Sequence, residues 1–375
     1  MNKRMAVMLG AALVVGTAVV VSAQSKVTTL TFYSSGDVNV KNLWENNLLP
    51  MYERANPFVK FNLVFSQAGA GNQATVDRLA AAKKAGQVSG IDLIEGPVGD
   101  AGDAGLLTKL DAKKVFRLNR VETNVFNRLK GFGLPYRGSS VVLAYNSAKV
   151  AKPPLNLPDL LAWIQKNPGQ FTYNAPDAGG SGNAFVTRIL RLGINDADAS
   201  TFETGYDAGL IKQWDRGFET LKAIAPSLYN GGQYSKNNAE TIQLLARGAI
   251  TMGPVWSDQG LSALAQGVLP TQVKLAQINP PFYGGSSYLG VVADSPNQAA
   301  VFRFMNWLLS EEVQAVVVDK MNGYPGVKIV FMPDAVRTKF NALAKTFSFG
   351  FSSKFGADMN RLWYERIAGT PQPAR

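Results

Sequence analysis

Apolar residues in the first third of the chain follow two different spacings. Residues 59–65 place an apolar side chain at every second position, residues 27–33 are rich in β-branched and aromatic side chains, and residues 90–94 form a short apolar run. These three segments are predicted to be strands. Residues 42–55 and 75–85 instead repeat apolar positions at helical spacing. The alternation of strands and helices predicts an α/β fold with a largely parallel sheet.

Polar or glycine-rich loops follow all three predicted strands. Ser34 and Ser35 follow the first strand, a glycine-rich loop that contains Gly69 follows the second, and Glu95 follows the third. The carboxyl ends of parallel strands meet at one edge of a sheet, which is where ligands bind in such folds. We therefore expect these four residues to line a binding cleft.

A second glycine-rich loop lies in the middle of the chain. The β-prone residues 171–173 are followed by the sequence GGSGN at 179–183 and by an amphipathic run over 184–192. A helix that begins at Ser181 or Asn183 would point free N–H groups at a ligand, and Gly182 would let the ligand approach the backbone. An ordinary turn between strand and helix is the alternative. The motifs of phosphate loops and of dinucleotide sites are absent.

Aromatic and acidic side chains follow another predicted strand, at 250–253. Trp256 can stack on a planar or cationic ligand, and Asp258 can pair with a cationic group. Burial of Trp256 against the sheet and a helix-capping role for Asp258 are the alternatives. Tyr136 and Tyr283 precede two further predicted strands and are also candidates for the cleft.

The amino terminus has the features of a secretory signal peptide. Lys3 and Arg4 precede an apolar run, and Val21-Ser22-Ala23 fits the cleavage rule, so residues 1–23 are expected to be removed. A retained membrane anchor is the alternative. The chain contains no cysteine with which to attach a lipid after cleavage. We expect an exported protein, in the periplasm or secreted.

Composition narrows the classes of function. The absence of cysteine and histidine removes disulfides, thiolate metal sites and the usual general base. Catalysis through carboxylates or a Ser-Lys pair stays open. The net charge is +11, but the basic residues are dispersed, with adjacent pairs at Lys83-Lys84 and Lys113-Lys114. This dispersion argues against a nucleic-acid partner.

The order of several segments resembles a known family. The sequence DLIEG is followed by GLLTKLD, then by LPYRGSSVVLAYNSAKV, PPLNLPDLLAWIQKNPGQFTY and GGSGNAF, and later by GVVADSPNQAAVFRFMNWLLSEEVQAVVVDKMNGYPGV. This order resembles the extracellular solute-binding proteins of ABC importers, family 1. It is most similar to the branch that binds iron, thiamine or polyamines, and within it to thiamine-binding-protein-like members. The resemblance covers nearly the whole mature chain.

The resemblance implies a periplasmic-binding-protein type II fold, an α/β fold of two lobes, each a mainly parallel sheet flanked by helices, joined by a hinge. Lobe 1 would comprise residues 24–137 and 280–324, and lobe 2 residues 138–279 and 325–375. The implied function is to capture a small solute between the lobes and deliver it to the permease of an ABC importer. The protein would act as a monomer, without a cofactor, a metal or catalytic residues.

Two other functions are compatible with the residues: a secreted hydrolase that uses Glu95 and Asp258, and a non-catalytic envelope protein. Ferric-iron members of the resembled family use adjacent tyrosines, often with histidine, and this chain has neither. A polyamine would use Asp37, Glu95 and Asp258. Thiamine or a related cationic heterocycle suits Trp256, the tyrosines and one acid. The sequence therefore favours a cationic solute over iron.

Overall fold

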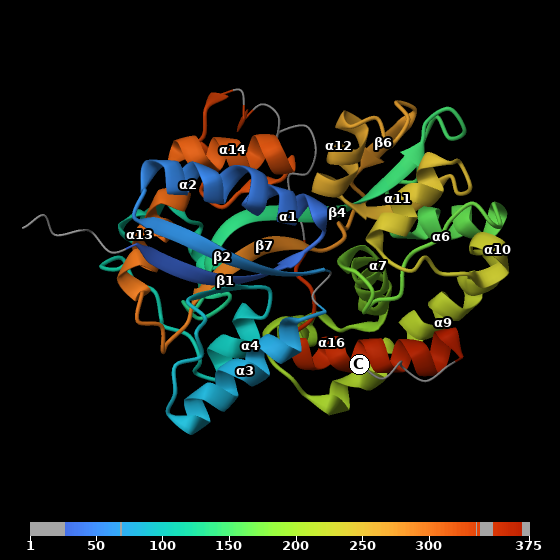
Figure 1. Ribbon diagram of the computed structural model, residues 1–375. Helices are drawn as coiled ribbons and strands as arrows, with labels where there is room; N and C mark the ends of the chain where they lie inside the picture. Colours follow the sequence, from blue (N-terminus) through green and yellow to red (C-terminus); the bar gives the residue numbers. More distant parts are fainter. Residues whose placement is uncertain (1–26, 68–69, 335, 338–347, 370–375) are drawn as a thin grey trace, which may run out of the picture.

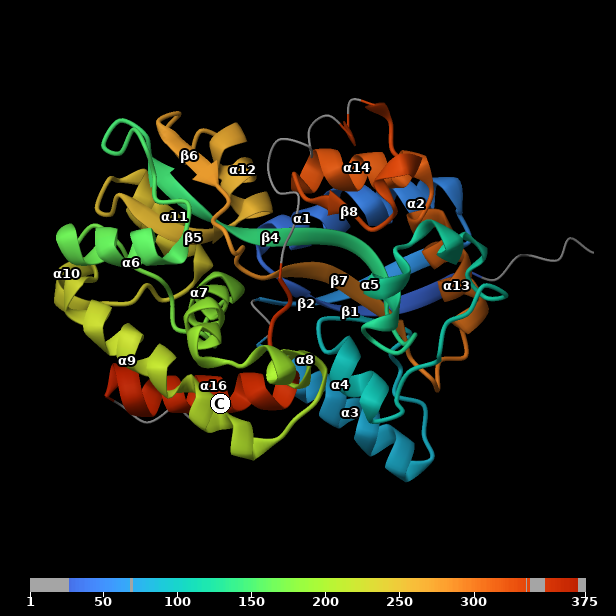
Figure 2. The same cartoon turned by 180° about the vertical axis from the view of Figure 1, so that it is seen from behind.

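The computed structural model describes residues 27–67, 70–334, 336–337 and 348–369. Two lobes lie side by side, and the long strand β4 (Leu134–Asn146) runs from one into the other (Figures 1 and 2). The expected signal peptide and Gly69 lie outside the described residues. No helix in the described ranges is long and apolar enough to span a membrane.

Lobe 1 contains the predicted βαβαβ segment. Its strands are β1 (Thr28–Gly36), β2 (Val59–Gln67), β3 (Leu93–Glu95), β7 (Gly284–Val291), β8 (Tyr324–Pro325) and the first half of β4. The order along the sheet is β2-β1-β3-β7-β4. Strand β1 runs parallel to β2 and β3, whereas β7 runs antiparallel to β3 and β4.

The expectation of a mainly parallel sheet is therefore wrong, because the sheet is mixed. Strand β4 leaves lobe 1 at the edge where β1, β2 and β3 end, and β7 enters lobe 1 at the same edge on its return from lobe 2. A strand that returns from that edge must run opposite to the strands that end there. The parallel pairs are confined to the amino-terminal βαβαβ segment, where helices serve as crossovers.

Helices cover both faces of the lobe 1 sheet (Figure 1). They are α1 (Val38–Leu43), α2 (Leu49–Ala55), α3 (Asn72–Ala85), α4 (Val98–Asp103), α5 (Thr123–Asn127), α13 (Gln298–Leu308) and α14 (Glu311–Met321). A π-helical turn, Trp44–Leu48, joins α1 to α2. One core packs α1, α2, α13 and α14 on the sheet, and a smaller core packs α3 and α4 on the other face.

Lobe 2 is built around the second half of β4. Side chains of Val141 and Leu143 enter one core, and those of Val142 and Ala144 enter another. Because successive side chains of a strand point to opposite faces, this apolar stretch is buried from both sides. Strands β5 (Met252–Trp256) and β6 (Val273–Ala276) pair with it in antiparallel fashion.

The helices of lobe 2 are α6 (Leu157–Lys166), α7 (Gly180–Leu190), α8 (Ala199–Thr204), α9 (Asp215–Ile224), α10 (Tyr229–Gly232), α11 (Asn238–Ala246), α12 (Ser257–Ala265) and α16 (Ser353–Trp363). Helix α16, red in Figure 1, buries Phe355, Met359 and Trp363 in the larger core of this lobe. Several boundaries differ from the sequence prediction. Ser34 and Ser35 belong to β1, and Glu95 belongs to β3, rather than to the loops that follow these strands. Residues 254–256 belong to β5 rather than to a loop, and residues 134–138 belong to β4.

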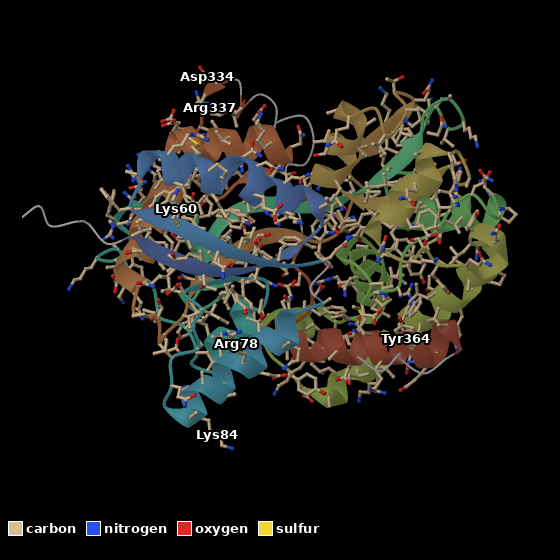
Figure 3. The ribbon with its side chains drawn as sticks, viewed as in Figure 1. Lys60, Arg78, Lys84, Asp334, Arg337 and Tyr364 are labelled. Carbon is tan, nitrogen blue, oxygen red and sulfur yellow. The ribbon has the colours of Figure 1, made fainter. Side chains whose placement is uncertain are left out.

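The cores show where the chain changes lobes. Tyr136 packs in the core of lobe 1, and Val141 packs in the larger core of lobe 2. The return falls between Phe282 in lobe 2 and Leu289 in lobe 1. The third crossing lies beyond the expected position near Tyr324, because residues 327 and 332 still pack in lobe 1. Figure 3 likewise shows Asp334 and Arg337 above α14. Val327 and Met332 are hydrophobic and pack in the core of lobe 1, so the chain stays in lobe 1 beyond β8.

Candidate functional site

A cavity of about 360 Å³ lies between the lobes. Lobe 1 contributes Asp37 and Asn39, where β1 leads into α1, and lobe 2 contributes Trp256 and Asp258, where β5 leads into α12. Tyr283 and residues 284–287 of the returning chain complete the wall. The volume falls in the range of small-molecule sites, and the mixture of aromatic and polar groups is typical of them.

Hydrogen bonds join the lobes on both sides of this cavity. The amide of Asn39 donates to Asp258 Oδ2 at 3.2 Å, and the amide of Asn238 donates to Asp37 Oδ2 at 3.1 Å. Each bond joins a carboxylate of one lobe to an amide of the other. The lobes are therefore in direct contact, and a solute in the cavity would touch both.

Glu95 is buried beneath the cavity and its oxygens are already occupied. Oε2 accepts hydrogen bonds from Ser34 Oγ at 2.6 Å and from Trp44 Nε1 at 2.9 Å. Oε1 accepts one from the hydroxyl of Tyr136 at 2.5 Å and lies 3.6 Å from a guanidinium nitrogen of Arg137. Burial raises the pKa of Tyr136 well above its ordinary value, so this hydroxyl stays a donor. Glu95 thus holds the lobe together at the start of β4.

Arg137 connects this buried group to the cavity. Its second guanidinium nitrogen lies 3.8 Å from Asp258 Oδ2, and Ser139 Oγ donates to Asp258 Oδ1 at 2.6 Å. Burial lowers the pKa of Arg137, but the negative groups around it outweigh burial and raise that pKa above its ordinary value. Asp258 therefore has a cationic partner and two hydrogen-bond donors before any solute binds.

Asp37 is the cavity carboxylate that has more oxygen lone pairs left to bind a solute. Its hydrogen-bond partner is the neutral amide of Asn238, and it forms no ion pair with any residue of the described chain. Burial raises the pKa of Asp37, and repulsion from Asp258 adds to the rise, while the Asn238 hydrogen bond and Arg137 oppose it. A half-buried carboxylate with a raised pKa is stabilised when a cation binds beside it.

Aromatic rings form the opposite wall of the cavity. The rings of Trp256 and Tyr283 meet edge to face, with centroids 6.0 Å apart. Trp256 also packs closely on α7, since a Cβ at Gly180 would lie 2.4 Å from Trp256 Cζ2. Burial raises the pKa of Tyr283 above its ordinary range, so its hydroxyl is neutral. Both rings are partly exposed, which leaves surface for a planar ligand.

The amino terminus of α7 faces asparagine side chains. The N–H of Ser181 donates to Asn238 Oδ1 at 3.2 Å, and the N–H of Gly182 donates to Asn174 Oδ1 at 3.0 Å. The hydroxyl of Ser181 lies within hydrogen-bond distance of Oδ1 of both asparagines, at 2.8 and 2.7 Å, and can donate its one proton to either, while the amide of Asn183 donates to the Pro176 carbonyl. These groups have internal partners, so the structure does not present them to a ligand as the sequence analysis expected.

The sequence candidates thus separate into groups. Trp256, Asp258 and Tyr283 meet at the cavity. Ser34 and Glu95 line a separate hollow of about 280 Å³ beside α3. Five others do not line the cavity, and all of them except the partly exposed Asn183 are buried: Ser35, Tyr136, Ser181, Gly182 and Asn183.

Sequence reasoning did not place four polar residues of this region in the cleft. Asp37 entered only as a carboxylate for a polyamine, although its position directly after the first strand was a usable signal. Asn39, Arg137 and Ser139 also line the cavity. The sequence holds no comparable signal for these three, because distant segments bring them together.

Comparison with known proteins gives the family. The sequence profile of the bacterial extracellular solute-binding proteins matches residues 48–340. A search of curated protein sequences found no match.

Solved structures share the fold at low sequence identity. A putative extracellular solute-binding protein from Bordetella parapertussis is 18% identical, with a TM-score of 0.70 over 90% of this chain and 98% of the other. The spermidine/putrescine-binding protein PotD from Streptococcus pneumoniae is 14% identical, with a TM-score of 0.64 over 90% and 98%. AfuA from Actinobacillus pleuropneumoniae, solved with fructose-6-phosphate, is 16% identical, with a TM-score of 0.64 over 91% and 99%.

The profile spans well over half of the chain, and the fold agrees with it. The chain belongs to the bacterial extracellular solute-binding proteins, and it is a solute receptor that acts outside the cytoplasm.

Proposed function

We propose that the protein captures a small organic cation between its lobes and delivers it to the permease of an ABC importer. The observation that carries this proposal is Asp37, a desolvated carboxylate at the cavity whose partner is a neutral amide. The resemblance to ABC-importer receptors supports the transport role, as does the shared fold of PotD, the substrate-binding protein of a spermidine/putrescine ABC transporter. Export through cleavage after residue 23 is part of the proposal.

Charge in the cavity contrasts with charge on the surface. The whole chain has a net charge of +11, and basic side chains such as Lys84 project into solvent (Figure 3). Asp37 and Asp258 line the cavity with Arg137, the one cationic side chain among the described residues that line it, and Arg137 also contacts the buried Glu95. A local excess of negative charge with low-dielectric walls attracts a cation even when the protein as a whole is basic.

The arrangement favours one class of cation over the others. Asp258 is neutralised in part by Arg137, which leaves Asp37 as the open carboxylate. One open carboxylate beside the rings of Trp256 and Tyr283 suits a planar cation with a single positive centre. A polyamine needs several carboxylates, and a ferric ion would be repelled by Arg137. A cationic heterocycle such as thiamine is the solute that we favour.

The Asp37→Asn variant tests this assignment, with Asp319→Asn on the exposed surface of α14 as the control. Calorimetry with thiamine, putrescine and spermidine should show binding of at least one cation, strongest for thiamine. Loss of one partner of a buried charged pair costs about 2–5 kcal/mol, so Asp37→Asn should weaken binding by about 30-fold to several thousand-fold. Equal affinity in both variants, or no binding of any of the three cations, would refute the proposal.

The pKa of Asp37 adds a dependence on pH. A cation binds the ionised carboxylate, so affinity should fall as the pH drops through a folded pKa that lies above the ordinary value. In the solute-free protein the sign is opposite, because a raised pKa means that ionisation of Asp37 destabilises the fold. Asp37→Asn should therefore be at least as stable as the wild type at neutral pH. Thermal unfolding with and without thiamine separates the two effects.

A further inference from the structure

Asn238 connects the amino terminus of α7 to the carboxylate that we propose as the cation site. It is the first residue of α11 in lobe 2, and it is 5% exposed. On one side, its Oδ1 accepts from the N–H of Ser181 at 3.2 Å and lies 2.7 Å from the hydroxyl of Ser181. On the other side, its Nδ2 donates to Asp37 Oδ2 at 3.1 Å, across the junction of the lobes. Asn238 does not line the cavity itself, so it can act on a solute only through Asp37.

The orientation of the Asn238 amide follows from its neighbours. A backbone N–H can only donate, so the oxygen of the amide faces Ser181 and the amino group faces Asp37. The loop before α7 packs closely on the same side chain, since a Cβ at Gly179 would lie 2.4 Å from Asn238 Oδ1. Lobe 2 therefore presents a donor to Asp37 in a fixed direction, and that donor is neutral.

This donor limits what Asp37 can offer to a solute. Asp37 lines the cavity, its Oδ2 is occupied by Asn238, and its Oδ1 accepts no hydrogen bond from the described part of the chain. The fold thus holds one carboxylate oxygen and leaves the other for the solute. A guanidinium group binds a carboxylate best through both oxygens, so it loses part of that advantage here. A cation with one positive centre needs only the free oxygen.

The neutrality of Asn238 also sets the charge of the site. The charged groups that act on Asp37 are Asp258, which repels its ionised form, and Arg137, which stabilises that form. Asp258 already has Arg137 as a cationic partner at 3.8 Å. The pair of Asp37 and Asn238 therefore carries a single negative charge. A carboxylate in place of the Asn238 amide would add a second negative charge at hydrogen-bond distance from the first.

We propose that Asn238 is the residue that restricts the site to solutes with one positive centre. It is a positioning residue, which holds one oxygen of Asp37 with a neutral donor and leaves the solute one oxygen and one negative charge. Dications such as putrescine are disfavoured by charge, and guanidinium cations are disfavoured by geometry. This inference rests on the proposed function, because it assumes that Asp37 binds the cationic centre of the solute.

The Asn238→Asp variant tests the argument from charge, since aspartate keeps the oxygen that faces Ser181 and replaces the amino group that faces Asp37. Calorimetry on the mature protein, freed of solute, gives the affinities for putrescine and thiamine. Selectivity for putrescine should rise about tenfold, as expected for one more solute charge roughly 10 Å from the new carboxylate at an effective dielectric constant of about 20. Two adjacent carboxylates retain a proton to higher pH than one, so the pH midpoint of thiamine binding should also rise. The control is Asn46→Asp, an exposed residue of the turn between α1 and α2 with the same change in net charge, and it should alter neither quantity.

The Asn238→Ser variant tests the argument from geometry without adding charge. Serine has a shorter side chain that cannot span from α11 to Asp37, so Oδ2 of Asp37 becomes free. Selectivity for methylguanidine over thiamine should rise about tenfold, as for one added hydrogen bond between charged groups. The N–H of Ser181 loses its acceptor in this variant, so the melting temperature should fall. The measurement is therefore the ratio of the two affinities in folded protein.

The outcomes separate this inference from the proposed function. If the wild type binds none of thiamine, putrescine and spermidine, the proposed function fails, and the inference fails with it. If the wild type binds thiamine but both Asn238 variants keep the wild-type selectivities and pH midpoint, the inference alone is overturned. A rise of each selectivity in its own variant, with no change in Asn46→Asp, supports the role of Asn238. A rise in one variant only supports the corresponding argument, from charge or from geometry, and overturns the other.

Discussion

Glu95 holds a buried hydrogen-bond network, and the variant Glu95→Gln tests whether that role is structural. The sequence placed Glu95 at the end of a strand, where it could equally contact a ligand. In the structure its side chain is 3% exposed and accepts from Ser34, Trp44 and Tyr136. Glutamine has nearly the same shape but replaces one oxygen with an amino group that can only donate. The change therefore isolates hydrogen bonding and charge from packing.

The orientation of the new amide follows from its neighbours. Trp44 Nε1 can only donate, so the amide oxygen must stay on that side. The amino group then faces the hydroxyl of Tyr136, which already accepts from Arg137 Nε at 2.9 Å, and the guanidinium of Arg137. A charged hydrogen bond and one of the two carboxylate partners of Arg137 are lost. Breaking a buried pair in this way costs about 3–5 kcal/mol.

Thermal unfolding measures this cost. At roughly 2–4 °C per kcal/mol for a domain of this size class, the melting temperature should fall by about 6–20 °C. Glu365→Gln, in an exposed pair with Arg361, is the matched control and should change stability by less than about 0.5 kcal/mol. If Glu95→Gln leaves the melting temperature unchanged but selectively abolishes solute binding, Glu95 is a ligand contact and the structural assignment fails.

Two further substitutions separate packing from binding. Gly182→Ala should destabilise the fold by about 1–3 kcal/mol or more, because the added Cβ would clash with the backbone oxygen of Asn174. The control is Gly356→Ala in α16, where the added Cβ meets no atom within 4 Å, and this variant should be as stable as the wild type or more so. Equal melting temperatures of the two variants would contradict this prediction. Trp256→Ala should weaken thiamine binding by about 1–3 kcal/mol in calorimetry. Trp256→Phe should weaken it by less, because an aromatic ring still faces Tyr283. Wild-type affinity in the alanine variant would show that Trp256 does not contact the solute.

Local pattern in the sequence was enough to predict the α/β class and the position of most strands. Residues 141–144 of the predicted strand 139–145 are apolar at consecutive positions, and in the structure they are buried from both faces. The sequence places Trp256 and Asp258 just after a predicted strand, and both residues do line the cavity. These inferences depend on spacing within about ten residues, which the sequence displays directly.

Only the tertiary structure decided which polar groups are free to bind a solute. Ser34 and Asp37 are close neighbours in the sequence, yet their hydrogen-bond partners lie far apart along the chain. Ser34 donates to Glu95, 61 positions away, and Asp37 accepts from Asn238, 201 positions away. Ser181 and Gly182 have the composition of a ligand loop, but Asn174 and Asn238 occupy their N–H groups. Whether a donor or acceptor is available depends on partners that distant segments bring to it. Buried polar groups must be satisfied, and that requirement is fulfilled across the fold rather than along the chain.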